Sequence, residues 1–198
     1  MTFLVLDVDR GGDGHWTNEL HRRYGIDRPA LRDAFFAPYW GDIVTGRRPI
    51  EPALADAFDA IGAAASVDDV VACWFEADFV PVPRAIELAR RAASAGVVVA
   101  AGTNQESRRA THLREHLGTL FPLTQLIASA DVGWPKPEPE FFLAADRRLG
   151  REPGTSVVFA DDGPANVEVA RAHGWSAVHV GEGPDWITEV EALLGLEA

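Results

Sequence analysis

Two pairs of acidic residues each follow directly on a short apolar segment. Asp7 and Asp9 close the first apolar segment of the chain, and Asp161 and Asp162 close another that begins at Val157. Carboxylate oxygens are the ligands that Mg²⁺ prefers, and a carboxylate can also attack an electrophilic centre to form a covalent intermediate. Taken singly, an aspartate at a strand end is more often a turn or helix-capping residue. The chemistry therefore depends on what else lies beside these two pairs.

Three further polar residues occupy comparable places between the acidic pairs. Thr103 and Asn104 follow the apolar segment Val97–Ala101, and Lys136 lies between two prolines ahead of a helical pattern. A hydroxyl, an amide and an ammonium group can all donate hydrogen bonds to phosphoryl oxygens. Each also has an ordinary explanation, as a helix cap or a solvated charge. Their arrival in order at the ends of successive strands favours one shared site.

A phosphate monoester would use every one of these groups. Its hydrolysis needs a nucleophile, an acid for the leaving oxygen and positive charge around the transferring group. Asp7 is the candidate nucleophile, and Asp9 is the candidate acid and then base. Like unit charges about 4 Å apart repel by about 4 kcal/mol at an effective dielectric of about 20, so the attack requires a cation. Asp7 and Asp162 are candidate ligands for Mg²⁺. Lys136 would neutralise charge, and Thr103 would bind a phosphoryl oxygen.

Five short apolar segments predict the strands of one sheet. Each is nearly continuous in apolar residues, as expected for parallel strands covered on both faces. A helical pattern precedes each of the last four strands and ends at a glycine, the usual stop signal of a helix. This alternation predicts an open, doubly wound, Rossmann-like parallel sheet of α/β class. The predicted strands are Phe3–Leu6, Val97–Ala101, Leu126–Ala128, Val157–Ala160 and Ala177–Val180. The predicted helix stops are Gly96, Gly118, Gly150 and Gly174.

About 90 residues separate the first two predicted strands, far more than one crossover requires. We therefore expect an α/β core, residues 1–12 and 81–198, with an all-helical cap, residues 13–80, inserted after the first strand. Ligands of such sheets bind at the carboxyl ends of the strands, so the cap would cover the site. The predicted helix starts in the cap are Thr17, Pro29, Pro52 and Ser66, the last with Asp69 three residues on as in a capping box.

The composition excludes several classes of function. The chain has 198 residues and a formal net charge of -12, which disfavours nucleic acid or an anionic membrane as partner. No apolar segment approaches the length of about 20 residues that spans a bilayer. Cys73 is the only cysteine and sits in an apolar helical pattern, so we expect a buried thiol. These features are typical of a reduced cytoplasmic protein.

The polar segments resemble the four motifs of the haloacid dehalogenase-like superfamily. Its motifs are an Asp-x-Asp sequence, an apolar strand ending in Ser or Thr, a lysine, and a pair of acids. The matching segments here are Asp7-Val-Asp9, Val97–Thr103 with Asn104, Pro135-Lys136-Pro137 and Phe159-Ala-Asp161-Asp162. The resemblance spans nearly the whole chain and is to the branch with a helical cap inserted after the first motif.

The resemblance implies a Rossmann-like core, Mg²⁺ as cofactor and a phosphorylated aspartate as intermediate. It also implies that the main-chain carbonyl of Asp9 joins the metal ligands. By the same resemblance Asp162 binds the metal directly, and Asp161 binds it directly or through water.

Thr103, Asn104 and Lys136 are the candidate substrate-binding residues, and Arg10 is a fourth. The sequence departs from the family here, because Arg10 and Gly11 stand where the family usually has Gly followed by Thr or Val. This segment could be a hinge for the cap, or Arg10 could reach the substrate phosphate. A solvated Arg10 and a weakened turnover are the other interpretations.

The sequence thus predicts a magnesium-dependent phosphatase acting on a small phosphorylated metabolite through an aspartyl phosphate. Dehalogenation is disfavoured, since an alkyl halide needs no proton from an acid at Asp9. A phosphotransferase or phosphomutase of the same superfamily stays an alternative, as does a non-catalytic relative that binds a phosphometabolite. A receiver domain has the acidic pair first and lacks the large insertion, so it is disfavoured.

Overall fold

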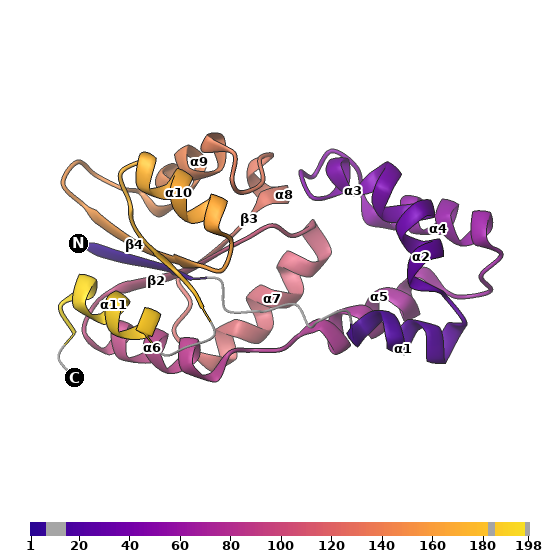
Figure 1. Cartoon of the computed structure of the whole chain (residues 1–198), viewed down its shortest axis with the longest axis horizontal. Coiled ribbons are helices and arrows are strands. Elements are labelled where there is room, and N and C mark those ends of the chain that lie inside the picture. The colour runs from indigo at the N-terminus through magenta and orange to yellow at the C-terminus, as the bar shows by residue number, and fades with distance from the viewer. Residues whose placement is uncertain (7–14, 182–184, 197–198) are drawn as a thin grey trace.

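The computed structural model describes residues 1–6, 15–181 and 185–196 of the chain. Figure 1 shows a sheet with its flanking helices at one end of the molecule and a group of helices, α1 to α5, at the other. Within the described residues, no helix is long and apolar enough to cross a bilayer.

The sheet has five parallel strands, as the sequence predicts, and their order is β3-β2-β1-β4-β5. Along β1 the side chains alternate, so that Leu4 and Leu6 enter one hydrophobic cluster while Phe3 and Val5 enter another on the opposite face. Both faces are therefore buried, which explains the continuous apolar segments. The strands are β1 (Thr2–Leu6), β2 (Val98–Thr103), β3 (Gln125–Ala128), β4 (Ser156–Asp161) and β5 (Ser176–His179).

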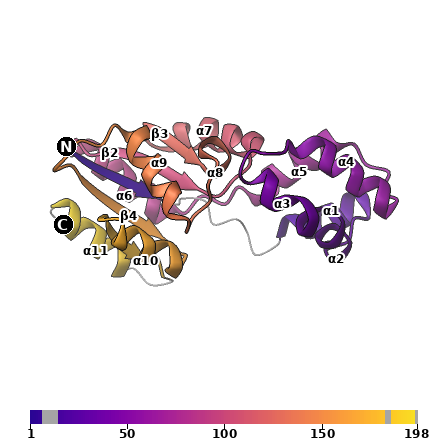
Figure 2. The ribbon, with the colours of Figure 1, turned by 90° about the horizontal axis from the view of Figure 1, so that it is seen from above.

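Helices cover both faces of the sheet, which makes the fold doubly wound (Figure 2). One hydrophobic cluster takes in α6 (Pro83–Ser94), α7 (Ser107–Leu120) and α11 (Asp185–Leu194). The other takes in α9 (Pro139–Leu149) and α10 (Pro164–Ala172). A short helix, α8 (Ser129–Val132), follows β3. The predicted α/β Rossmann-like class is confirmed.

Three of the four predicted helix stops are confirmed and one is wrong. Gly96, Gly150 and Gly174 adopt φ values of 82°, 64° and 92°, the left-handed conformation that ends a helix. Gly118 does not stop its helix, because α7 continues to Leu120. A glycine inside a helix costs only about 1 kcal/mol relative to alanine, and the apolar stripe of α7 outweighs that cost.

Helices α1 to α5 form a hydrophobic cluster of their own between β1 and β2 in the sequence. Cys73 belongs to this cluster and is 3% exposed, as predicted. The Ser66 side chain accepts a hydrogen bond from the Asp69 amide, which confirms the predicted cap, but Thr17 lies inside α1 rather than before it. The helical segments are α1 (His15–Tyr24), α2 (Arg28–Leu31), a π-helix (Arg32–Phe36), α3 (Ala37–Ile43), α4 (Ile50–Ile61) and α5 (Val67–Asp78).

The division into a core of residues 1–12 and 81–198 and a cap of residues 13–80 stays a prediction. Its first boundary lies outside the described residues. We use the word cap below for helices α1 to α5 and the loops that join them.

A stacked pair of histidines lies where α7 meets the cap. The His112 ring stacks on His116 with ring centroids 3.9 Å apart and packs against Phe75 of α5 at 5.5 Å. Burial, together with the positive charges of His116 and Arg109, lowers the pKa of His112 from its ordinary 6.5 to about 4. The folded protein therefore keeps His112 neutral where the unfolded chain would protonate it.

We expect this histidine to make the protein lose stability as the pH falls from about 6.5 to about 4. In that window the unfolded chain binds a proton that the folded chain does not, and below it no further loss is expected. Urea unfolding between pH 7 and pH 4 measures the effect. His112→Phe should flatten the pH dependence. Equal slopes in wild type and His112→Phe would contradict the assignment.

Candidate active site

The carboxyl edge of the sheet brings together residues from three of the predicted segments. β1 lies between β2 and β4, and Leu6 is aligned with Ala101 on one side and Ala160 on the other. Thr103 and Asp161 are the last residues of β2 and β4, one or two places beyond the predicted strand ends. Asp7, Asp9 and Arg10 lie outside the described residues, so their predicted roles stay predictions.

A buried ion pair joins Lys136 to Asp161. The Lys136 Nζ lies 2.5 Å from the Asp161 Oδ2, and the two side chains are 2% and 0% exposed. The same ammonium donates to the carbonyl of Gly102 at 2.7 Å and lies over the ring of Phe159, 5.7 Å from its centroid. Two segments that the sequence analysis singled out separately thus meet at one point below the surface.

The second oxygen of Asp161 is held as firmly as the first. Its Oδ1 accepts hydrogen bonds from the Gly163 amide at 2.8 Å and from the Asn166 Nδ2 at 2.7 Å. A Cβ at Gly163 would lie 2.6 Å from that Asn166 nitrogen, so a larger residue there would displace the Asn166 side chain from Asp161. Three donors from two segments therefore fix both oxygens of this carboxylate.

Asn104 ties the loop after β2 to the loop that carries Lys136. Its Nδ2 donates to the Lys136 carbonyl and its Oδ1 accepts from the Lys136 amide, both at 2.7 Å. The peptide bond between Lys136 and Pro137 is cis. These contacts give the Asn104 side chain a role in positioning Lys136. Its predicted contact with substrate stays a prediction.

Thr103 and Asp162 lie beside this pair with different surroundings. Thr103 is 7% exposed at the end of β2 and is aligned with Ala128 of β3. Asp162 is exposed, and its side chain has no hydrogen-bond or ion-pair partner in the part of the chain that the structure describes. Its main-chain carbonyl lies 2.9 Å from the Nε2 of His179, which comes from β5.

The exposed Asp162 carboxylate is available to a hard cation. Magnesium takes oxygen ligands and usually keeps several waters, so an exposed carboxylate at the strand end suits it better than the Asp161 carboxylate, which three hydrogen bonds already occupy. Among the residues that the structure describes, no three His, Cys, Asp or Glu side chains gather as a metal site. The other two predicted ligands, Asp7 and Asp9, lie outside that set.

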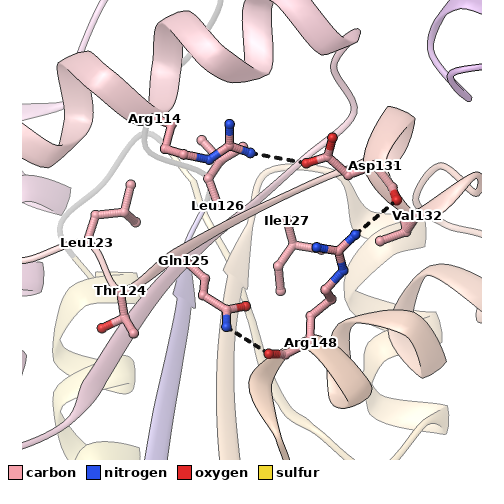
Figure 3. Close-up of a pocket in the computed structure, with 9 residues that line it drawn as sticks. All are labelled: Arg114, Leu123, Thr124, Gln125, Leu126, Ile127, Asp131, Val132 and Arg148. Atoms are coloured by element: carbon pink, nitrogen blue, oxygen red, sulfur yellow. Dashed lines mark hydrogen bonds and ion pairs between the residues drawn. The ribbon is translucent and has the colours of Figure 1, made fainter.

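A separate pocket of about 360 Å³ lies along β3, the edge strand of the sheet (Figure 3). The Arg114 side chain forms an ion pair with Asp131 at 3.1 Å. The Arg148 side chain donates to the main-chain carbonyl of Asp131 at 3.2 Å. The main-chain carbonyl of Arg148 accepts from the Gln125 side chain at 2.8 Å. None of the predicted site residues lines this pocket. Charged side chains over an edge strand protect it from pairing with other strands.

The family assignment rests on a match over most of the chain. The model of the haloacid dehalogenase-like hydrolases matches residues 9–174 of the chain. The chain belongs to this family. The match takes in Thr103, Lys136, Asp161 and Asp162, so the buried ion pair lies within a haloacid dehalogenase-like hydrolase.

Known proteins agree with the fold of this hydrolase. A haloacid dehalogenase family enzyme from Bacteroides thetaiotaomicron, solved with magnesium, superimposes with a TM-score of 0.74 at 18% identity over 94% of this chain and 96% of that one. An L-2-haloacid dehalogenase superimposes with a TM-score of 0.67 at 17% identity over 94% and 87% of the two chains. The fold is thus shared with a family enzyme solved with magnesium and with a protein named as a dehalogenase.

One curated protein is similar in sequence to this hydrolase over part of its length. Fructose-1-phosphate phosphatase YqaB of Escherichia coli (strain K12) is 38% identical over 82 residues. The match covers 41% of this chain and 43% of that protein.

Two positioning residues were missed by the sequence analysis. Asn166 binds Asp161 from the first turn of α10, and the Gly163-Pro164 helix start could have indicated that a side chain three residues on would face the strand end. Arg109 is 1% exposed in α7. It precedes Leu113 and Leu117 at four-residue spacing, so it lies on the apolar stripe of that helix.

The ion pair predicts an asymmetric response to mutation. We expect Lys136→Met to lower the free energy of unfolding by about 3–5 kcal/mol, because the Asp161 charge would stay buried without its partner. The double variant Lys136→Met/Asp161→Asn should recover a large part of that loss. Urea unfolding at pH 7 measures both, with Arg84→Met, at an exposed position of α6, as control. Equal losses in the single and double variants would show that the pairing of charges does not decide the stability.

Proposed function

We propose that this hydrolase is a phosphatase for a small organic phosphate monoester. The observation that carries the proposal is the buried Lys136–Asp161 pair at the carboxyl edge, where the Lys136 ammonium donates to the carbonyl of Gly102, the residue before Thr103. Ligands of such sheets bind at this edge. A fixed ammonium and a hydroxyl at this edge suit a phosphoryl group, which accepts hydrogen bonds and carries negative charge.

The proposed reaction has two steps. A carboxylate oxygen of Asp7 attacks phosphorus, the bond from phosphorus to the leaving oxygen breaks, and Asp9 gives its proton to that oxygen. Water then attacks the phosphorus of the aspartyl phosphate while Asp9 takes a proton from it. The bond between Asp7 and phosphorus breaks, which releases inorganic phosphate and restores both carboxyl groups.

Lys136 and Thr103 act on the phosphoryl group in both steps. The ammonium of Lys136 supplies positive charge without moving, because Asp161 and the Gly102 carbonyl hold it. Thr103 donates to a phosphoryl oxygen. Preorganised donors of this kind need no rearrangement as charge develops on the transferring group.

Magnesium is the proposed cofactor. It would be held by Asp7, the main-chain carbonyl of Asp9 and Asp162, and when bound it screens the repulsion between the Asp7 carboxylate and the phosphate dianion. The exposed Asp162 carboxylate supports this proposal, as does the magnesium in the Bacteroides enzyme of the same fold.

A sugar phosphate is the first substrate to test. The Escherichia coli relative is named as a fructose-1-phosphate phosphatase, which supports a phosphorylated metabolite of similar size. A transferase or phosphomutase would use the same aspartyl phosphate with a hydroxyl in place of water. Assays that follow both phosphate release and phosphoryl transfer distinguish the two.

We expect phosphate release from p-nitrophenyl phosphate to require magnesium and Asp7. EDTA should abolish it, and Asp7→Asn should lower the turnover number on the order of 10⁴-fold or more, because an amide cannot form the acyl phosphate. Asp59→Asn, at an exposed position of α4, should keep full activity. Phosphate release and thermal unfolding check these variants together. Substantial turnover in folded Asp7→Asn would contradict the covalent mechanism.

The role of Asp9 as acid predicts a dependence on the leaving group. Asp9→Asn should slow hydrolysis of fructose 1-phosphate by roughly 10²–10⁴-fold, the usual contribution of general acid catalysis. Hydrolysis of p-nitrophenyl phosphate should fall much less in its first step, since nitrophenolate leaves without a proton. Burst kinetics separate that step from the second. An equal loss of the first step for both esters would rule out Asp9 as the acid.

A further inference from the structure

Arg108 of α7 forms exposed ion pairs with Glu51 and Asp68 of the cap, which contribute little to stability. Two buried contacts also join the cap to the core. At one of them Arg109 of α7 reaches the end of α5. Its Nη1 donates to the Phe75 carbonyl at 2.5 Å, and its guanidinium lies 5.3 Å from the Phe75 ring centroid and 3.8 Å from Asp78. The Arg109 side chain is 2% exposed. We refer to this contact as the pivot.

The second contact joins α8 to the loop after α3. The hydroxyl of Ser129 donates to the Val44 carbonyl at 2.6 Å and is fully buried. Two residues later in the loop, Gly46 adopts a φ of 71°, and a Cβ built on it would lie 2.4 Å from the Ala130 carbonyl oxygen. The two backbones thus approach as closely as only glycine allows. We refer to this contact as the clasp.

The clasp lies next to the proposed phosphate site. Ser129 directly follows Ala128, which is aligned with Thr103 in the neighbouring strand. The Gln105 carbonyl accepts from the Ala130 amide, and it is also a second, longer acceptor for the Ser129 hydroxyl, both at 3.3 Å. The pivot begins in α7, on the other side of the same loop, so the two contacts flank the segment from Thr103 to Ser107.

The two contacts differ in what must break to release them. The pivot holds a buried guanidinium against a carbonyl, a ring and a carboxylate at once. The clasp holds one hydroxyl against one carbonyl, with a close backbone approach beside it. Loss of the clasp would therefore free the cap from α8 while the pivot stays formed. Figures 1 and 2 show α8 beside the loop that follows α3.

We propose that the clasp of Ser129 with Val44 and Gly46 limits the size of the leaving group that the site accepts. The proposal rests on the proposed phosphatase function. While the clasp is formed, the cap is fastened on both sides of the Thr103 loop, which limits the space for a leaving group. Weakening the clasp lets the cap stand further from the core on that side, so a larger ester fits.

The test compares two aryl esters of different size. p-Nitrophenyl phosphate and 4-methylumbelliferyl phosphate share the same reacting group, but the second has two fused rings. In Ser129→Ala and Gly46→Ala the ratio of kcat/KM for the larger ester to that for the smaller should rise by about threefold to tenfold, the equivalent of one ordinary hydrogen bond. A merely structural role would lower both values together and leave their ratio unchanged.

The chain offers a matched control for each variant. Gly62 has a φ of 68°, similar to that of Gly46, but a Cβ there would meet nothing within 4 Å. Gly62→Ala therefore carries the backbone strain without the clash. Ser94→Ala removes an exposed hydroxyl at the end of α6. A ratio that stays at the wild-type value in both clasp variants, or that rises equally in the controls, overturns the proposal.

Amide hydrogen exchange of residues 41–49 tests the clasp independently of enzyme activity. Exchange in this segment should rise in both clasp variants relative to their controls. Equal exchange would overturn the clasp whatever the kinetics show. If exchange rises in the clasp variants but the enzyme hydrolyses neither ester, the proposed phosphatase function is overturned. The size limit, which rests on that function, then fails as well. The clasp would still be confirmed as a contact between the cap and the core.

Discussion

The buried ion pair of Lys136 and Asp161 decides how the carboxyl edge is built, because neither charge could be kept there alone. Moving an ammonium or a carboxylate out of water costs several kcal/mol, and mutual attraction offsets that cost only when the remaining hydrogen-bonding groups are also satisfied. The Gly102 carbonyl, the Gly163 amide and the Asn166 side chain satisfy them. These contacts hold the loop before α9 against the ends of β2 and β4.

The choice of lysine at this point is informative in a chain that otherwise uses arginine. Lysine and arginine together number 18, and Lys136 is the only lysine among them. A position that needed only positive charge would carry arginine in such a composition. An ammonium is a compact charge with three donors, whereas a guanidinium is a planar fork that requires more space. The buried Lys136 ammonium makes its contacts of 2.5 Å and 2.7 Å as such a compact group.

Patterns within a few residues predicted the helices and strands. Contacts between residues distant in the sequence, which such patterns do not show, decided how the site is assembled. The strands, three glycine stops and the Ser66 cap follow from patterns within a few residues, and the structure confirms them. Gly118 failed as a stop because packing of α7 on the sheet outweighs a small local preference. The partnership of Asn104 with the Lys136 loop spans 32 residues of sequence, so no pattern near either residue indicates it. The predicted roles of Asp7, Asp9 and Arg10 stay predictions for the separate reason that these residues lie outside the described ones.

Helix α7 connects the chemistry of the edge to the position of the cap. It begins at Ser107, and Glu106 caps it by accepting from the amides of Arg108 and Arg109. Burial raises the pKa of Glu106, although these hydrogen bonds favour its ionised form. The same two arginines hold the cap, Arg108 through ion pairs with Glu51 and Asp68 and Arg109 through the pivot. A shift of the cap would therefore act on the helix that directly follows the Thr103 loop. Under the proposed function, cap residues remote from phosphorus would then alter how that loop holds the phosphate.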